Sequence, residues 1–156
     1  MQIRTFTDTD IDAIVSLFYE TVHEVNKRDY LQEQLDAWAS QDDKPLKLQI
    51  WGQSMRQNIA YVAEIDGKLV GFSDLTPHGR LDRLYVHKDF QRQGIASALV
   101  TRLEEAARHA GMVEIDTEAS ITAKPFFESR GYRVVLAQEV ERKGIKLVNF
   151  KMHKPL

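Results

Sequence analysis

The segment Gln91-Arg92-Gln93-Gly94-Ile95-Ala96 has the residue types of a loop that binds a diphosphate. A helix that starts in such a loop has backbone N–H groups without intrahelical partners and a partial positive charge, and both attract phosphate. Gly94 would let the main chain approach the diphosphate, and Arg92 adds a positive charge. The small side chains of Ala96 and Ser97 leave room on the first turn. The segment therefore predicts a site for a phosphate-bearing ligand.

The flanking segments decide how this loop is interpreted, because a lone glycine between a strand and a helix is most often an ordinary turn. Leu81–Val86 before the loop has the pattern of a strand, and apolar residues recur at helical spacing over Gly94–Ala110. No Gly-Lys-Ser/Thr sequence follows the glycine, and the three spaced glycines of a dinucleotide-binding loop are missing. A nucleoside triphosphatase and a dehydrogenase are therefore disfavoured.

The rest of the chain alternates between helical and strand patterns. On the N-terminal side we predict helices over Asp8–Val25 and Gln32–Ala39, an ambiguous stretch over Gln41–Asn58 that is helical at best over Leu46–Arg56, and strands over Ile59–Ile65 and Lys68–Leu75. On the C-terminal side we predict a strand over Val113–Thr117, a short helix over Thr122–Arg130, and strands over Arg133–Val140 and Lys146–His153. This alternation predicts an α/β fold, a mixed sheet with helices on both faces.

Two local signals support this assignment of elements. Asp66-Gly67 between two predicted strands is a strong hairpin signal, and Thr7-Asp8-Thr9-Asp10 offers a side-chain cap and first-turn carboxylates for the first helix. No repeat, low-complexity tract or linker marks a second domain. We therefore expect one domain over residues 1–156.

The composition excludes several classes of function. With 21 basic against 23 acidic residues, no global field attracts nucleic acid or anionic lipid. The chain has no cysteine, which excludes disulfides, thiolate metal sites and a cysteine nucleophile, and no histidine spacing suggests a metal site. The polar, acidic N-terminus does not resemble a signal peptide, and no apolar run approaches the roughly 18 residues of a membrane span. We expect a soluble, cytoplasmic protein with no nucleic-acid or membrane partner and no metal.

Two motifs resemble those of the GNAT superfamily of acyl-CoA-dependent N-acyltransferases. Gln91, Gly94 and Ala96 fit the family signature Gln/Arg-x-x-Gly-x-Gly/Ala, which follows a strand similar to Leu-Tyr-Val. The segment Ala123–Tyr132 is similar to the family's Ala-x-x-Phe-Tyr-Glu-x-x-Gly-Phe helix and strand. The resemblance extends to the order of elements along the whole chain. It implies the GNAT-like fold, with a central, mostly antiparallel sheet of about six or seven strands.

The resemblance implies acetyl-CoA as cosubstrate and acetyl transfer to a primary amine of a small molecule or peptide, by direct attack in a ternary complex. A main-chain N–H near Val86 would polarise the carbonyl, and the strand before the loop would present its backbone to the pantetheine arm. The residues expected to bind acetyl-CoA are Leu84, Tyr85, Val86, Gln91, Arg92, Gln93, Gly94, Ile95, Ala96, Ser97 and Phe127.

The candidates for the catalytic residues come from the positions around the cofactor loop and the second motif. The family's usual thiol-protonating tyrosine corresponds to Phe127, and a phenyl ring cannot donate a proton. Tyr85 is an alternative donor, while Tyr132 occupies what is normally an apolar position. Asp82 and Glu118 are the candidates for the base, directly or through water, although an isolated surface carboxylate is usually just solvated.

The acceptor is expected beside the connection of the first two helices, with His23, Asn26 and Tyr30 as candidate contacts, and beside the turn near Glu141–Gly144. A homodimer is one option for the assembly of the chain. Two alternatives stay open: a catalytically weak acyl-CoA sensor, which Phe127 favours, and a purely structural interaction domain.

Overall fold

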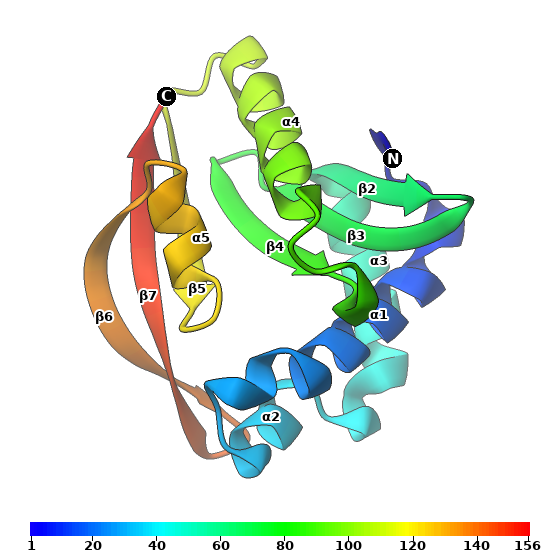
Figure 1. Ribbon diagram of the computed structural model, residues 1–156, viewed down its shortest axis with the longest axis vertical. Coiled ribbons are helices and arrows are strands. Elements are labelled where there is room, and N and C mark those ends of the chain that lie inside the picture. Colours follow the sequence, from blue (N-terminus) through cyan, green and yellow to red (C-terminus); the bar gives the residue numbers. More distant parts are fainter.

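Seven strands form one sheet in the order β1-β2-β3-β4-β5-β7-β6, in a computed structural model that describes all 156 residues (Figure 1). Neighbouring strands are antiparallel except β4 and β5, which are parallel. This confirms the predicted mixed, mostly antiparallel sheet. The strands are β1 Gln2–Thr5, β2 Ile59–Ile65, β3 Lys68–Leu75, β4 Arg80–Val86, β5 Glu114–Ser120, β6 Arg133–Arg142 and β7 Ile145–Pro155.

Helices cover both faces of the sheet (Figure 1). Helix α4 packs on one face of the β2–β4 region, and α1 and α3 pack on the other, while α5 lies beside β5 and β6. No helix combines the length and apolarity needed to cross a membrane. The helices are α1 Ile11–Glu24, α2 Gln32–Trp38, α3 Lys44–Gln57, α4 Ile95–His109 and α5 Lys124–Ser129, with single 3₁₀ turns at 8–10, 26–28, 41–43 and 88–90.

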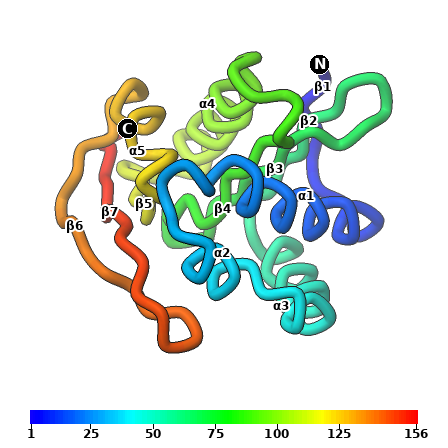
Figure 2. Tube along the Cα trace, turned by 60° about the horizontal axis from the view of Figure 1, so that its bottom comes forward, coloured from blue at the N-terminus to red at the C-terminus, as the bar shows by residue number.

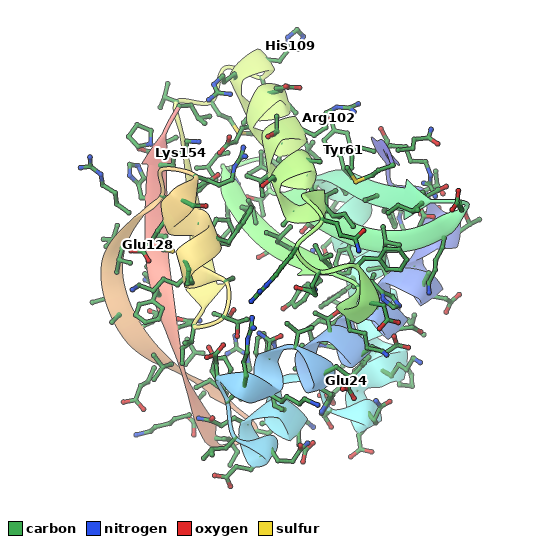
Figure 3. All side chains as sticks on the ribbon, in the orientation of Figure 1. Glu24, Tyr61, Arg102, His109, Glu128 and Lys154 are labelled. Atoms are coloured by element: carbon green, nitrogen blue, oxygen red, sulfur yellow. The ribbon has the colours of Figure 1, made fainter.

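Alternating side chains of β2 and β3 belong to two different layers of the core. Val62 and Phe72 join the cluster formed with α1 and α3, whereas Ala63 and Val70 pack against α4. This is the period of two expected for a strand buried on both faces. On the same helix, the Arg102 guanidinium lies over the Tyr61 ring of β2, 4.9 Å from its centroid (Figure 3). These contacts fix the position of α4, which follows the predicted phosphate loop.

Three differences from the sequence predictions have a clear cause in the structure. Strand β1 was not predicted, and it exists because Gln2–Thr5 pair with β2 and Arg4 forms ion pairs with Asp10 and Glu64. The ambiguous stretch before β2 is helical over Lys44–Gln57, where the Trp51 ring packs on the first helix. Strand β5 continues to Ser120, beyond the predicted end, because its last residues pair with β7.

Substituting Gly71 by alanine should destabilise the protein by about 1–3 kcal/mol, the usual penalty for overpacking. A Cβ atom there would lie 3.0 Å from Ile95 Cγ2 and 3.2 Å from Leu99 Cδ1, so the close approach of α4 to β3 requires glycine. Urea unfolding measures the change. Gly52→Ala in α3 is the control, since its nearest neighbours would be 3.6 Å away and alanine favours a helix. Equal stability of the Gly71 and Gly52 variants would contradict this packing account.

Candidate active site

The candidate site begins where β4 and β5 separate. The two strands pair only at Arg80↔Asp116 and Leu81↔Thr117, and the Thr117 hydroxyl adds a last bond to the Leu81 carbonyl at 2.8 Å. Beyond this point the strands diverge (Figure 1), and a cleft of about 380 Å³ opens between them. The sheet is therefore interrupted in its middle, and an extended ligand can lie between the two strands.

Backbone groups of β4 face this cleft. His87 N–H donates to the Val70 carbonyl of β3 at 2.8 Å, and antiparallel bonding alternates, so the N–H and C=O groups of Leu84 and Val86 point away from β3. The Val86 carbonyl accepts bonds from Gln91 Nε2 at 2.7 Å and from Thr21 Oγ1 at 3.2 Å. The Val86 N–H and both groups of Leu84 have no partner in β5, because the pairing has already ended. These are the groups that the predicted pantetheine contacts require.

The predicted phosphate loop leads directly into α4. Arg92 and Gly94 both have left-handed backbone conformations, with φ of 60° and 80°. Apart from residues 93–95 themselves, no atom lies within 4 Å of the position that a Cβ at Gly94 would occupy, so the space in front of the helix is open. Ala98 N–H is the first to donate within the helix, to Gly94 C=O at 3.0 Å. The preceding N–H groups of the first turn are left free for an anionic ligand.

The cleft includes almost all residues predicted to bind acetyl-CoA, and Gln93 is the one that does not line it. The predicted residues that line it are Leu84, Tyr85, Val86, Gln91, Arg92, Gly94, Ile95, Ala96, Ser97 and Phe127. The residues predicted from the loop and from the strand before it therefore line one cavity.

Phe127 stands where the family motif has a tyrosine, and Tyr132 stands where the motif has a phenylalanine. Phe127 is 2% exposed and lines the cleft, with its ring 5.1 Å from that of Tyr132. The Tyr132 hydroxyl donates to the buried Glu104 carboxylate at 2.9 Å, and Lys154 Nζ contacts the same carboxylate at 2.8 Å. Burial, together with the neighbouring Glu104, raises the pKa of Tyr132. Tyr132 is thus a core residue, outside the cleft lining.

A second cavity of about 200 Å³ adjoins the cleft. The two cavities share six lining residues, which form their junction: Trp38, Leu81, Asp82, Tyr85, Glu118 and Ser120. All three predicted catalytic residues, Asp82, Tyr85 and Glu118, belong to this junction. A group held in the cleft can therefore meet a second molecule held in the adjoining cavity.

The two carboxylates at the junction have different partners. Glu118 lies 3.3 Å from Arg80, which also binds Asp116 at 3.0 Å. Asp82 lies 3.5 Å from Arg83, but that guanidinium is engaged by a fully buried second carboxylate, Asp74. Both arginines are thus shared with a second carboxylate, and Asp82 has the longer of the two ion-pair distances at the junction.

Tyr85 stays protonated at neutral pH. Burial among the Phe18 and Phe72 rings raises the pKa of its phenol, and the Trp38 side chain and the positive charge of Arg83 only partly oppose this. At the junction Tyr85 can donate a hydrogen bond, which Phe127 cannot.

The three predicted acceptor contacts lie in different places. Asn26 lines the cleft, and Tyr30 lines the second cavity. The Tyr30 hydroxyl donates to the Val148 carbonyl at 2.6 Å and accepts from Ile121 N–H at 2.9 Å, so it also holds β7 and the loop after β5 in place. His23 lines neither cavity, because its ring is directed to the Ala39 carbonyl at 3.0 Å.

Several lining residues were not named individually as candidates. Trp38, Arg80 and Arg142 reach the second cavity from α2, β4 and β6. Trp38 and Arg80 belong to no segment that was predicted for the site, whereas Arg142 lies in the turn near Glu141–Gly144 that was expected beside the acceptor. The Ser120 hydroxyl accepts from Ala123 N–H at 3.0 Å, as expected for a residue that precedes a helix.

Comparison with known proteins identifies the family. The model of a family described as an acetyltransferase (GNAT) domain matches residues 26–154. The chain belongs to the GNAT family. It is therefore an N-acyltransferase by family, and GNAT enzymes use acetyl-CoA as cosubstrate.

Relatives of this GNAT chain cover nearly its whole length. It is 33% identical to the uncharacterised N-acetyltransferase YafP of Escherichia coli (strain K12), over 99% of this chain and 97% of that protein. A crystal structure of a GCN5-related N-acetyltransferase from Rhodopseudomonas palustris matches with a TM-score of 0.92 and 29% identity, over 99% and 95% of the two chains.

A more distant GNAT structure shares the fold. The PaiA N-acetyltransferase from Thermoplasma acidophilum, solved in complex with coenzyme A, matches with a TM-score of 0.79 and 17% identity, over 99% of this chain and 98% of that one. The arrangement of sheet and helices is thus common to chains with little sequence in common.

Proposed function

We propose that this GNAT enzyme transfers the acetyl group of acetyl-CoA to a primary amine of a small molecule or peptide, by direct attack in a ternary complex. The observation that carries the proposal is the junction of the two cavities. The cleft offers unpaired backbone groups for an extended cosubstrate, and it meets the second cavity at Asp82, Tyr85 and Glu118.

Binding of acetyl-CoA would use the groups that the fold leaves without partners. The free N–H groups at the start of α4 and the open space before Gly94 suit the diphosphate. The backbone of Leu84 and Val86 suits the amides of the pantetheine arm, which then directs the thioester towards the junction. Phe127 contributes an apolar wall to the same cleft.

The chemistry requires no covalent enzyme intermediate. The amine nitrogen attacks the thioester carbon, forming the C–N bond, while the Val86 N–H stabilises the developing oxyanion. The amine loses its proton to Asp82, directly or through water, and the C–S bond breaks to release coenzyme A. Because a thiol has a pKa of about 8.5, the thiolate can leave near neutral pH, with Tyr85 available to protonate it.

The proposal is tested by measuring acetyl-CoA binding by calorimetry and then free-thiol release in the presence of a panel of amines. Amine-dependent thiol release with formation of the N-acetyl product supports the enzyme. Binding without amine-dependent release would instead support the acyl-CoA sensor, which the phenyl ring of Phe127 favours. Absence of binding would leave the structural interaction domain.

Phe127→Tyr should raise kcat about tenfold. A hydroxyl at this position of the cleft would supply the proton donor that the family motif usually carries, and general acid catalysis contributes roughly 10²–10⁴-fold in favourable cases. The smaller value is expected because the thiolate already leaves well without help. Phe126→Tyr is the matched control, since Phe126 also lines the cleft and the same hydroxyl is added one residue away. Equal kcat for the two variants would show that thiol protonation does not limit turnover.

A further inference from the structure

The charges of the second cavity are unevenly placed. Asp82 and Glu118 line both cavities, so they stand at the junction where the acetyl group would arrive. Arg142 lines the second cavity but not the cleft. The same is true of the β6 and β7 residues Val140, Leu147, Val148 and Asn149. The second cavity therefore has carboxylates where it meets the cleft, an arginine on the β6–β7 hairpin and apolar side chains along its walls.

Arg142 has no counter-ion within the protein. Arg80, the other arginine of the cavity, binds Asp116 and Glu118, and Arg83 nearby binds the buried Asp74. No carboxylate lies within 4.0 Å of Arg142, whose Nη1 donates only to the Glu141 carbonyl at 3.1 Å. Most of its donors are thus free, in a fork geometry that matches a carboxylate.

Lys47 strengthens the positive potential behind this arginine. Its Nζ lies 4.8 Å from the Phe18 ring centroid and 5.0 Å from that of Trp51, with no carboxylate within salt-bridge distance. Burial lowers the pKa of Lys47, and the positive charges of Arg83 and Arg142 lower it further, although Asp43 opposes them. An anion bound at Arg142 would relieve this mutual repulsion.

The hairpin that carries Arg142 is held against the helices. The tip of β6 and β7 lies beside α2 (Figure 2), where Gln34 Nε2 donates to the Lys146 carbonyl at 3.0 Å. Lys143 at the tip pairs with Asp43 at 3.2 Å. These contacts restrain the strand end that bears Arg142, so the backbone from which the guanidinium lines the cavity is fixed.

We propose that the acceptor is a small amino acid, whose amine lies at Asp82 and Glu118 and whose carboxylate pairs with Arg142. This inference rests on the proposed acetyl transfer and adds the chemical class of the acceptor. An apolar spacer between the two charged groups of the acceptor would contact Leu147 and Val148.

The test compares linear amino acids of increasing chain length with their carboxamides and with alkylamines of equal length, by thiol release from acetyl-CoA. We expect the acids to exceed their amides in kcat/KM by about 10- to 100-fold, the worth of one charge-assisted contact. Arg142→Gln should remove most of that preference by raising the KM of the acids. The KM of the amides should change far less. Arg133→Gln, an exposed arginine on the same hairpin outside both cavities, should leave the preference intact.

The outcomes separate the two proposals. Equal rates for acids and amides in the unmodified protein would overturn the inference about the acceptor while acetyl transfer stands. A loss in Arg142→Gln that is equal for acids and amides would also overturn it. No thiol release with any amine would overturn the proposed function itself. The comparison within the unmodified protein does not depend on the folding of a variant.

Discussion

Gly94→Glu should weaken acetyl-CoA binding by at least about 100-fold. The new carboxylate would occupy the open space before α4, where the diphosphate is proposed to lie, and juxtaposed like charges cost several kcal/mol, with 1.4 kcal/mol per tenfold in affinity. The left-handed φ of 80° adds backbone strain of about 1–2 kcal/mol, which lowers stability but not binding specifically. Calorimetry with acetyl-CoA measures the first effect and thermal unfolding measures the second.

Gly67→Glu provides a closely matched control. Gly67 in the turn between β2 and β3 has φ of 78°, and its Cβ would also have no neighbour within 4 Å. The substitution therefore adds the same charge and similar strain at a site outside both cavities. We expect similar losses of stability in the two variants and normal binding in Gly67→Glu. Normal acetyl-CoA binding by Gly94→Glu as well would contradict the proposal that this loop binds the diphosphate.

Asp82→Asn should lower kcat by about 100-fold or more, with acetyl-CoA affinity retained. Asparagine has the same shape but cannot take the proton of the attacking amine, and a positioned general base contributes roughly 10²–10⁴-fold. Asp82 is tested first because its ion pair is the weaker: Arg83 lies 3.5 Å away and is engaged by the buried Asp74, whereas Arg80 lies 3.3 Å from Glu118. Steady-state thiol release gives kcat, and calorimetry gives the affinity.

Two further carboxylates serve as comparisons for Asp82. Asp116→Asn removes a partner of Arg80 that lines neither cavity, so it should leave kcat close to its original value. Glu118→Gln alters the other carboxylate at the junction. A large loss of kcat in Glu118→Gln, with little loss in Asp82→Asn, would identify Glu118 as the base instead.

The elements that could be predicted from the sequence are those defined by local signals. Asp66 and Gly67 have φ of 51° and 78°, the left-handed pair of a tight hairpin turn, and the strands on both sides end where the pattern predicted. Strand β1 could not be predicted, because it is short, polar and half-exposed. It is stabilised by pairing with β2, which lies far along the chain, and by the contacts of Arg4 with Asp10 and Glu64.

The candidate site also has a part that local sequence predicts and a part that depends on the fold. The residues proposed to bind acetyl-CoA come from one strand and the loop that follows it, so their order along the chain predicts their proximity. The acceptor cavity is assembled from α2, β4, β5 and the β6–β7 hairpin, and Arg142 reaches it only through the length and register of that hairpin. His23 was predicted from its place between two helices, but the direction of its ring depends on the Ala39 carbonyl of the following element.

The separation of β4 and β5 has a consequence for the abundance of the protein as well as for its activity. Only two residue pairs connect β5, β7 and β6 with the remaining strands, so the sheet contains a seam whose backbone groups lack protein partners. A cosubstrate that fills this seam adds RT ln(1 + [L]/Kd) to the free energy of unfolding, about 2.7 kcal/mol at a hundredfold excess over Kd. The concentration of acetyl-CoA would then affect both the rate of the reaction and the resistance of the enzyme to unfolding and proteolysis.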